Sequence, residues 1–237
     1  MTEYGTLYII ATPIGNLGDI SYRAIEILKT VDVLFAEDTR TTKVLLDRYA
    51  ISKKMFSYNA HATAATHTKI GELLKSGQSV GLVSDAGTPG ISDPGSLLIS
   101  YIYNTHKQEV VVVPIPGASA LTAIVSVCPL DTASWVFYGF LPHKKGRATL
   151  IQKIADSEMT SIVYESSHRI LKLLEALVPA LENTNKYITI GRELTKKFED
   201  IYTDTPKEVL DYIQKNPMKQ KGEFVVCIGT LVKYSKA

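Results

Sequence analysis

Short apolar runs rich in β-branched residues alternate with amphipathic stretches along the first half of the sequence, and this alternation restricts the possible folds most. Strands are expected at residues 7–11, 33–36, 55–58, 79–84 and 110–113, and helices between them at residues 21–31, 41–49, 62–75 and 97–104. Helices that connect successive strands are typical of a parallel sheet covered on both faces. The pattern therefore predicts an α/β fold whose first half is a parallel sheet.

The segment Pro114–Gly117 interrupts this alternation, and an uncharged helix is expected after it at residues 118–127. We place a domain boundary here, between an N-terminal domain of residues 1–117 and a C-terminal domain of residues 118–237. The second domain has expected strands at residues 135–140, 161–165, 187–190, 201–203 and 224–228, with helices at 147–155, 169–177 and 206–215. Its third and fourth strands are too close in sequence for a crossover helix, so this sheet is predicted to be mixed.

Composition excludes several classes of protein. Hydrophobic residues make up 45% of the chain and charged residues 21%, which rules out a disordered or low-complexity chain. The only two cysteines, Cys128 and Cys227, lie in apolar runs, so we interpret them as buried free thiols in a reducing compartment. No acidic partner accompanies His61 and His67, so no metal site is indicated. Without a membrane-length apolar stretch or a basic leader, the chain is expected to be cytoplasmic and to make no membrane contact.

Glycine- and proline-containing loops follow four of the expected strands in the first domain. They span residues 11–20, 36–40, 84–95 and 114–120. Parallel strands end at one edge of their sheet, where α/β proteins bind ligands, so these loops are candidates for a binding site. Any one of them could equally be an ordinary turn. None matches the dinucleotide fingerprint or the P-loop, so neither NAD nor ATP is indicated.

Seven motifs occur once each, in a characteristic order and spacing, over residues 5–230. They are ATPIGNLGDI from residue 11, AEDTR from residue 36, SDAGTP from residue 84, PGASA from residue 116, YESSHR from residue 164, GRELTK from residue 191 and KGEF from residue 221. Each motif is weak alone, but together they resemble the tetrapyrrole methylase superfamily, and within it the branch that methylates ribosomal RNA.

The resemblance implies a two-domain α/β fold, a homodimer, and S-adenosylmethionine bound in the cleft between the domains. It also implies methylation of one ribose 2′-hydroxyl, that of cytidine 1402 in the 16S rRNA of the 30S subunit. Carried over by position, the expected cofactor contacts are Pro13, Ile14, Asp85, Gly87, Thr88, Ser119, Ala120 and Tyr164.

A ribose hydroxyl is a poor acid, so its methylation calls for a base or a charged hydrogen-bonding partner near the 2′-oxygen. The candidates are His168, Glu37, Asp38 and Glu165, among which His168 is the only histidine inside a motif. Structural alternatives exist for three of them. Asp38 could be a helix N-cap, Glu165 could pair with Arg169 at i, i+4, and His168 could hydrogen-bond at a helix start.

Basic side chains are candidates for contacts with RNA phosphates. We single out Arg40, Lys144, Lys145, Arg147, Arg169, Arg192 and Lys196. The 143–147 segment is the strongest candidate, because a basic glycine-containing loop can cradle a phosphate, whereas the 215–221 run could be a solvated face. Phosphate contacts of this kind would make RNA binding weaken as salt rises.

Two other functions stay open at this stage. A methylase that acts on a corrin or porphyrin would also suit a basic, aromatic-lined cleft, and a module without catalytic activity could bind the cofactor or RNA alone. Fold-level analogy does not separate them, because one fold hosts several chemistries. The sequence ends at Ala237, where many members of the resembled family continue for a few dozen residues, so a minimal enzyme and a truncated chain are both open.

Overall fold

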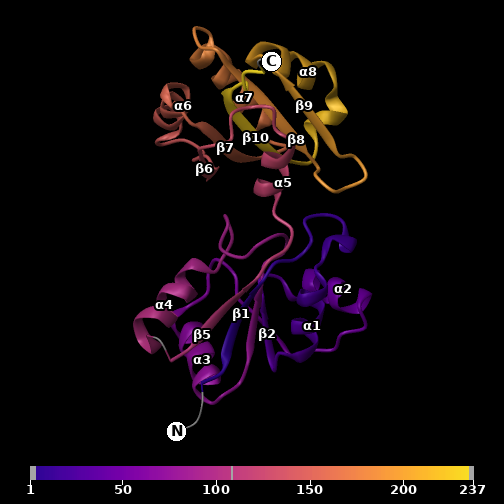
Figure 1. Cartoon of the computed structure of the whole chain (residues 1–237), viewed down its shortest axis with the longest axis vertical. Coiled ribbons are helices and arrows are strands. Elements are labelled where there is room, and N and C mark those ends of the chain that lie inside the picture. The colour runs from indigo at the N-terminus through magenta and orange to yellow at the C-terminus, as the bar shows by residue number, and fades with distance from the viewer. Residues whose placement is uncertain (1–3, 108, 235–237) are drawn as a thin grey trace. The chain divides into compact units, whose positions relative to one another are not determined.

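The chain divides into two compact units, Met1–Ser119 and Ala120–Ala237 (Figure 1). The computed structural model describes residues 4–107 and 109–234. The ends of the chain, on which the expectations about a leader and about the C-terminus depend, lie outside the described residues. Each unit contains one five-stranded sheet with its own covering helices.

The first unit is built on a parallel sheet with the strand order β3-β2-β4-β1-β5. Its strands are β1 (Thr6–Ile10), β2 (Val33–Ala36), β3 (Met55–Ser57), β4 (Val80–Val83) and β5 (Val111–Ile115). Its helices are η1 (Leu17–Asp19), α1 (Tyr22–Thr30), α2 (Thr39–Arg48), α3 (Ala64–Lys75) and α4 (Ser96–His106). Every neighbouring pair of strands runs parallel, so the predicted parallel sheet is confirmed.

Helices cover both faces of this sheet, as the alternation predicted. In β2, Val33 and Phe35 pack into the core under α3 and α4, whereas Leu34 and Ala36 pack into the core under α1 and α2. Successive side chains of a strand point to opposite faces, so a strand between two helical layers is apolar throughout. Figure 1 shows the two helical layers on opposite sides of the strands.

The connections from β1 and β4 diverge. The chain leaves β1 through α1 and returns at β2, beyond β4, whereas it leaves β4 through α4 and returns at β5, beyond β1. Because α1 and α4 lie on opposite faces, the loops after these two neighbouring strands separate at the carboxyl edge of the sheet. Such a divergence is where open α/β sheets form ligand sites.

The second unit contains a mixed sheet with the strand order β6-β7-β10-β8-β9. Its strands are β6 (Trp135–Phe140), β7 (Thr160–Ser166), β8 (Lys186–Arg192), β9 (Asp200–Asp204) and β10 (Glu223–Thr230). Only β6 and β7 pair in parallel, and the other three pairs are antiparallel. The mixed sheet inferred from the short connection between the third and fourth strands is therefore confirmed.

Helices lie on both faces of this second sheet as well. They are α5 (Ala120–Val127), α6 (Arg147–Asp156), α7 (Ile170–Leu181), α8 (Pro206–Lys215) and η2 (Pro217–Gln220). Helices α6, α7 and α8 share one core with Ile188 and Ile190 of β8. Gly191 faces the other way, and a Cβ added to it would lie 2.7 Å from Cδ1 of Ile124 in α5. The absent side chain thus lets α5 approach the opposite face closely.

The cysteines differ from expectation in one respect. Both are free, but only Cys227 is buried, whereas Cys128 is partly exposed because it lies just beyond the end of α5. Within residues 4–107 and 109–234, no helix has the length and apolar character needed to cross a membrane.

Candidate functional site

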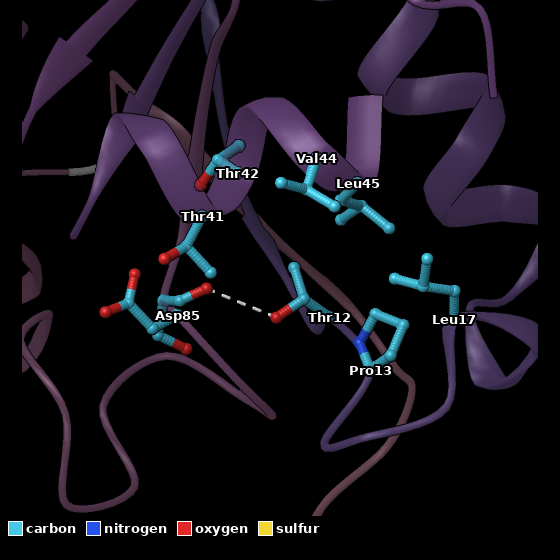
Figure 2. A pocket seen from close by; sticks show the side chains of 9 residues that line it. Thr12, Pro13, Leu17, Thr41, Thr42, Val44, Leu45 and Asp85 are labelled. Atoms are coloured by element: carbon cyan, nitrogen blue, oxygen red, sulfur yellow. Dashed lines mark hydrogen bonds between the residues drawn. The ribbon is translucent and has the colours of Figure 1, made fainter. Parts of the chain in front are cut away.

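A backbone bridge joins the diverging loops after β1 and β4. The Thr12 amide donates to the Gly87 carbonyl at 2.8 Å, and the Gly87 amide donates to the Thr12 carbonyl at 3.0 Å. The Thr12 hydroxyl also donates to the Ser84 carbonyl at 3.2 Å, the dashed line in Figure 2. Gly87 adopts a φ of 81°, a left-handed conformation that favours glycine. Together these contacts hold the two loops against each other.

The loop after β5 packs onto the same edge. The Thr88 hydroxyl donates to the Ala118 carbonyl at 3.3 Å. A Cβ added to Gly117 would lie 3.0 Å from the Cβ of Ala11, so this loop passes close to the end of β1. Three of the loops that the sequence singled out are therefore in direct contact.

A pocket of about 270 Å³ opens between the β1 and β4 loops and helix α2 (Figure 2). Its lining combines apolar and polar side chains, those of Thr12, Pro13, Leu17, Thr41, Thr42, Val44, Leu45, Ser84 and Asp85. Pro13 and Asp85 were predicted from the sequence, whereas the contribution of α2 was missed. Val44 is an apolar side chain of α2 that is 62% exposed, a feature that only the structure supplies.

The other predicted cofactor residues are divided between the units. Ile14, Gly87, Thr88 and Ser119 lie in the contacting loops of the first unit without lining this pocket. Ala120 is the first residue of α5, and Tyr164 lies in β7, so both belong to the second unit. The Tyr164 ring packs edge-on against Phe137 and Phe140, with centroid distances of 4.8 and 5.7 Å.

Carboxylates gather beside the pocket. The Asp85 amide donates to Oε2 of Glu37 at 3.2 Å, and the Asp38 amide donates to Oδ1 of Asp85 at 3.0 Å. Burial raises the pKa of Glu37, and the charge of Asp85 adds to this effect although the amide bond opposes it. Burial likewise raises the pKa of Asp93 to about 6, with the charges of Glu37 and Asp85 adding to it. This edge of the sheet therefore favours a cation, and Glu37 retains its proton to higher pH than an exposed glutamate.

Asp38 takes the N-cap role that was its structural alternative. Its side chain accepts from the Arg40 amide at 2.8 Å and pairs with the Arg40 guanidinium at 2.6 Å. Hydrogen bonds from Arg40 hold the pKa of Asp38 down to about 2. Asp38 thus begins α2, and Arg40, whose side chain is 90% exposed, is free to meet other groups as well.

Glu165 is the centre of a buried ionic cluster in the second unit. Its side chain is fully buried and lies 2.8 Å from Nε of Arg169 and 3.5 Å from Nη2 of Arg147. The same guanidinium groups donate to backbone carbonyls, Arg169 to Leu141 at 3.0 Å and Arg147 to Pro142 at 3.4 Å. The i, i+4 pairing considered for Glu165 is therefore present, and the cluster fixes the loop that follows β6.

Of the remaining basic candidates, some bond to other groups of the protein and others are exposed. Arg192 is only 8% exposed and donates to three backbone carbonyls, those of Phe198, Met218 and Lys221. Lys196 pairs with Glu193 at 3.0 Å and with Glu223 at 2.7 Å. Lys144 and Lys145 are exposed in the loop before α6, and His168 is exposed in the turn between β7 and α7. The structure thus gives Arg192 a role in the fold and leaves Lys144 and Lys145 accessible to a ligand.

No group of three or more His, Cys, Asp or Glu side chains within the described residues could hold a metal ion. The candidate site consists of strand-end loops, carboxylates and apolar side chains.

Comparisons with known proteins place these features in context. Residues 6–210 match the family model of tetrapyrrole (corrin/porphyrin) methylases. The chain is 44% identical to a protein of Borrelia garinii subsp. bavariensis named ribosomal RNA small subunit methyltransferase I, over 94% of this chain and 98% of that one. It is 42% identical to a protein of the same name from Haemophilus influenzae, over 94% of this chain and 78% of the relative.

Solved structures share the fold at low sequence identity. A diphthine synthase superimposes with a TM-score of 0.71 at 14% identity, covering 96% of this chain and 92% of its own. A uroporphyrin-III C-methyl transferase from Thermus thermophilus, complexed with S-adenosyl homocysteine, superimposes with a TM-score of 0.64 at 15% identity, covering 95% and 97%. At these identities the match establishes the fold.

Proposed function

The chain belongs to the tetrapyrrole (corrin/porphyrin) methylase family, and we propose that it methylates the ribose 2′-hydroxyl of cytidine 1402 in 16S rRNA. It is a methyltransferase of small-subunit ribosomal RNA, as its relatives' shared name indicates, and its cofactor is S-adenosylmethionine. The observation that carries the proposal is 44% identity over 94% of the chain to one of those relatives. A uroporphyrin-III C-methyl transferase of the same fold is only 15% identical to the chain.

The pocket beside β1 and β4 has the chemistry that S-adenosylmethionine requires. Pro13, Leu17 and Val44 supply apolar walls, while Asp85 supplies a carboxylate. Apolar surfaces suit the base and methylene groups, and a carboxylate suits a hydroxyl or a positive charge. When bound, S-adenosylmethionine supplies an electrophilic methyl group. We assign this pocket to one part of the cofactor.

Glu37 is our candidate for the base. Methyl transfer to a ribose hydroxyl forms a carbon–oxygen bond and releases the hydroxyl proton, which must be accepted as the bond forms. Glu37 contacts the pocket-lining residue Asp85, and burial raises the pKa of its carboxylate toward the range of a useful base. Asp38 and Glu165 are held in tight ion pairs, which makes them poor proton acceptors. His168 is the rival candidate.

The loop before α6 is our candidate for the RNA contact. Lys144 and Lys145 are exposed there, next to Gly146, which has a φ of 85°. Arg147 and Arg169 hold the loop in place through their ion pairs with the buried Glu165 carboxylate, so the backbone that carries the two lysines has a fixed position. A fixed pair of cations suits the phosphate backbone of RNA, because less conformational entropy is lost on binding.

We further propose a homodimer in the cytoplasm. The parallel sheet of the first unit ends in the edge strand β5, where Val111 is 58% and Val112 37% exposed. Apolar side chains on an open sheet edge favour a covering partner. The cytoplasmic location follows from the proposed substrate, the small ribosomal subunit.

The direct test of function is methyl transfer from labelled S-adenosylmethionine to 30S subunits that lack this 2′-O-methyl group. We expect label on one decoding-centre cytidine, mapped by its resistance to alkaline cleavage at that ribose. Naked 16S rRNA and a porphyrin precursor serve as alternative substrates. Label on the tetrapyrrole but not on 30S subunits would reverse the substrate assignment.

The pocket assignment predicts the effect of Val44→Phe. The side chain is largely exposed, so the fold should persist, while the larger ring fills space that the cofactor needs. We expect the Kd for S-adenosylmethionine to rise at least about 10-fold in calorimetry, which corresponds to about 1.4 kcal/mol. Lys43→Phe, on the neighbouring outward position of α2, is the matched control. Equal affinities in both variants would place the cofactor elsewhere.

The base assignment predicts the effect of Glu37→Gln. Loss of a general base lowers kcat by about 100-fold or more. Because the base works only when deprotonated, wild-type kcat should rise with pH through the raised pKa of Glu37 and then level off. The glutamine variant should lose that rise while binding the cofactor normally. If His168→Gln abolishes the rise and Glu37→Gln retains it, His168 is the base instead.

The RNA assignment predicts the effect of changing Lys144 and Lys145 together to alanine. Removing two phosphate contacts should lower the salt slope of 30S binding by about 1.5 and raise KM, with cofactor affinity unchanged. The control replaces Lys172 and Lys207, two exposed lysines at helix starts of the same unit, with alanine. An unchanged slope in the test variant would make the loop a solvated face.

A further inference from the structure

Two cysteine side chains lie on the α5 face of the second sheet, outside the candidate site. In β10, Val226 and Ile228 point into the core under α6, α7 and α8, so Cys227 between them points to the opposite face. In β8, Ile188 and Ile190 belong to the same core, so Thr189 also points away from it. Cys128 follows directly after α5, which packs on that opposite face.

The sulfur of Cys128 lies over the pair formed by Thr189 and Cys227. These two residues are register partners in adjacent antiparallel strands, and such partners have Cβ atoms about 4.5–5.5 Å apart. Cys128 Sγ lies 3.4 Å from Oγ1 of Thr189. The Cys128 and Cys227 thiols each shift the pKa of the other, as two neighbouring thiols do. The only two cysteines of a 237-residue chain therefore lie beside the same residue, Thr189, although they are far apart in sequence.

The surroundings of the two thiols differ in a way that suits two chemical roles. Cys128 is partly exposed, and its interactions with Cys227, the Thr189 hydroxyl and the Leu130 backbone lower its pKa to about 6 against the opposing effect of burial. The Thr189 hydroxyl also hydrogen-bonds to the Thr203 hydroxyl at 2.8 Å, which orients it. Cys227 is fully buried, and its contact with Cys128 together with burial raises its pKa. Cys128 can thus react with a reagent from solution as a thiolate, while Cys227 stays protonated as a thiol in the interior.

We propose that Cys128 and Cys227 form a reversible oxidation site that reacts with hydroperoxides such as hydrogen peroxide. The Cys128 thiolate attacks a peroxide oxygen, the O–O bond breaks, and hydroxide leaves and takes up a proton to become water. The resulting sulfenic acid condenses with the Cys227 thiol to give a disulfide and a second water. In sum, two thiols lose two protons and two electrons, and hydrogen peroxide is reduced to two waters.

The disulfide would join the C-terminal end of α5 to the middle of β10. A cross-link between these two positions closes a long loop, which restricts the unfolded chain and stabilises the folded unit. A thiol reductant such as glutathione returns both sulfurs to the reduced state by exchange through a mixed disulfide.

The first test measures reactivity of the intact wild-type protein. We expect iodoacetamide to alkylate Cys128 before Cys227, with a rate that rises around pH 6 in the folded protein and at distinctly higher pH in urea. Hydrogen peroxide should convert both thiols to an intramolecular disulfide, detected by peptide mapping and by a mass lower by two hydrogens. Two thiols that stay fully alkylatable after peroxide treatment would overturn the proposal, as would a disulfide formed only between chains.

Variants separate the two roles. Cys227→Ala should leave a Cys128 sulfenic acid that dimedone traps, whereas Cys128→Ala should give no dimedone adduct. Thr189→Val removes one hydrogen bond to the thiolate and should slow the peroxide reaction several-fold at pH 7 while retaining the fold by circular dichroism. Thr203→Val removes only the hydroxyl that orients Thr189, so it should slow the peroxide reaction less than Thr189→Val does. Equal peroxide rates in wild type and Thr189→Val would contradict the assigned role of that hydroxyl.

Discussion

Two backbone hydrogen bonds between Thr12 and Gly87 hold together the loops on which the rest of the first unit's site depends. The paired strands β1 and β4 place the starts of these loops side by side, but the chain then leaves them toward opposite edges and opposite faces of the sheet. The bridge brings Pro13 and Asp85 to one pocket, and it requires a left-handed backbone at Gly87. A side chain there would be strained and would press on Ile14, at 3.3 Å from the added Cβ.

Burial and charge pairing give neighbouring carboxylates opposite properties. Glu37 and Asp38 are adjacent, yet burial raises the pKa of Glu37 whereas hydrogen bonds from Arg40 lower the pKa of Asp38 to about 2. Glu165 is buried more deeply than Glu37, but two guanidinium groups compensate its charge. A buried carboxylate without a cation nearby can exchange a proton, while a buried carboxylate between two cations organises structure.

The sequence predicted the elements well because periodicity depends only on local pattern. In the described part of the chain, every strand lies within a few residues of the apolar run that indicated it, and the N-cap role of Asp38 was recognisable from adjacent residues. Contacts between distant segments were not predictable. Arg192 donates to a carbonyl 29 residues away, and Arg147 donates to Glu165, 18 residues away. Because the sequence does not reveal these partners, the RNA hypothesis for both arginines rested on their positive charge alone. The orientation of Val44 toward a pocket likewise depends on a loop that precedes it by some thirty positions.

The position of β10 has a consequence for how a nascent chain acquires its structure. Every strand of the first sheet lies within residues 6–115, so that sheet can close while the remainder is still being synthesised. The second sheet behaves differently, because its central strand, β10, is the last one made and is the only link between β7 and β8. Until residues 223–230 emerge from the ribosome, β6–β7 and β8–β9 are two separate ribbons with open, apolar edges. The second sheet therefore cannot be completed before residues 223–230 have been synthesised.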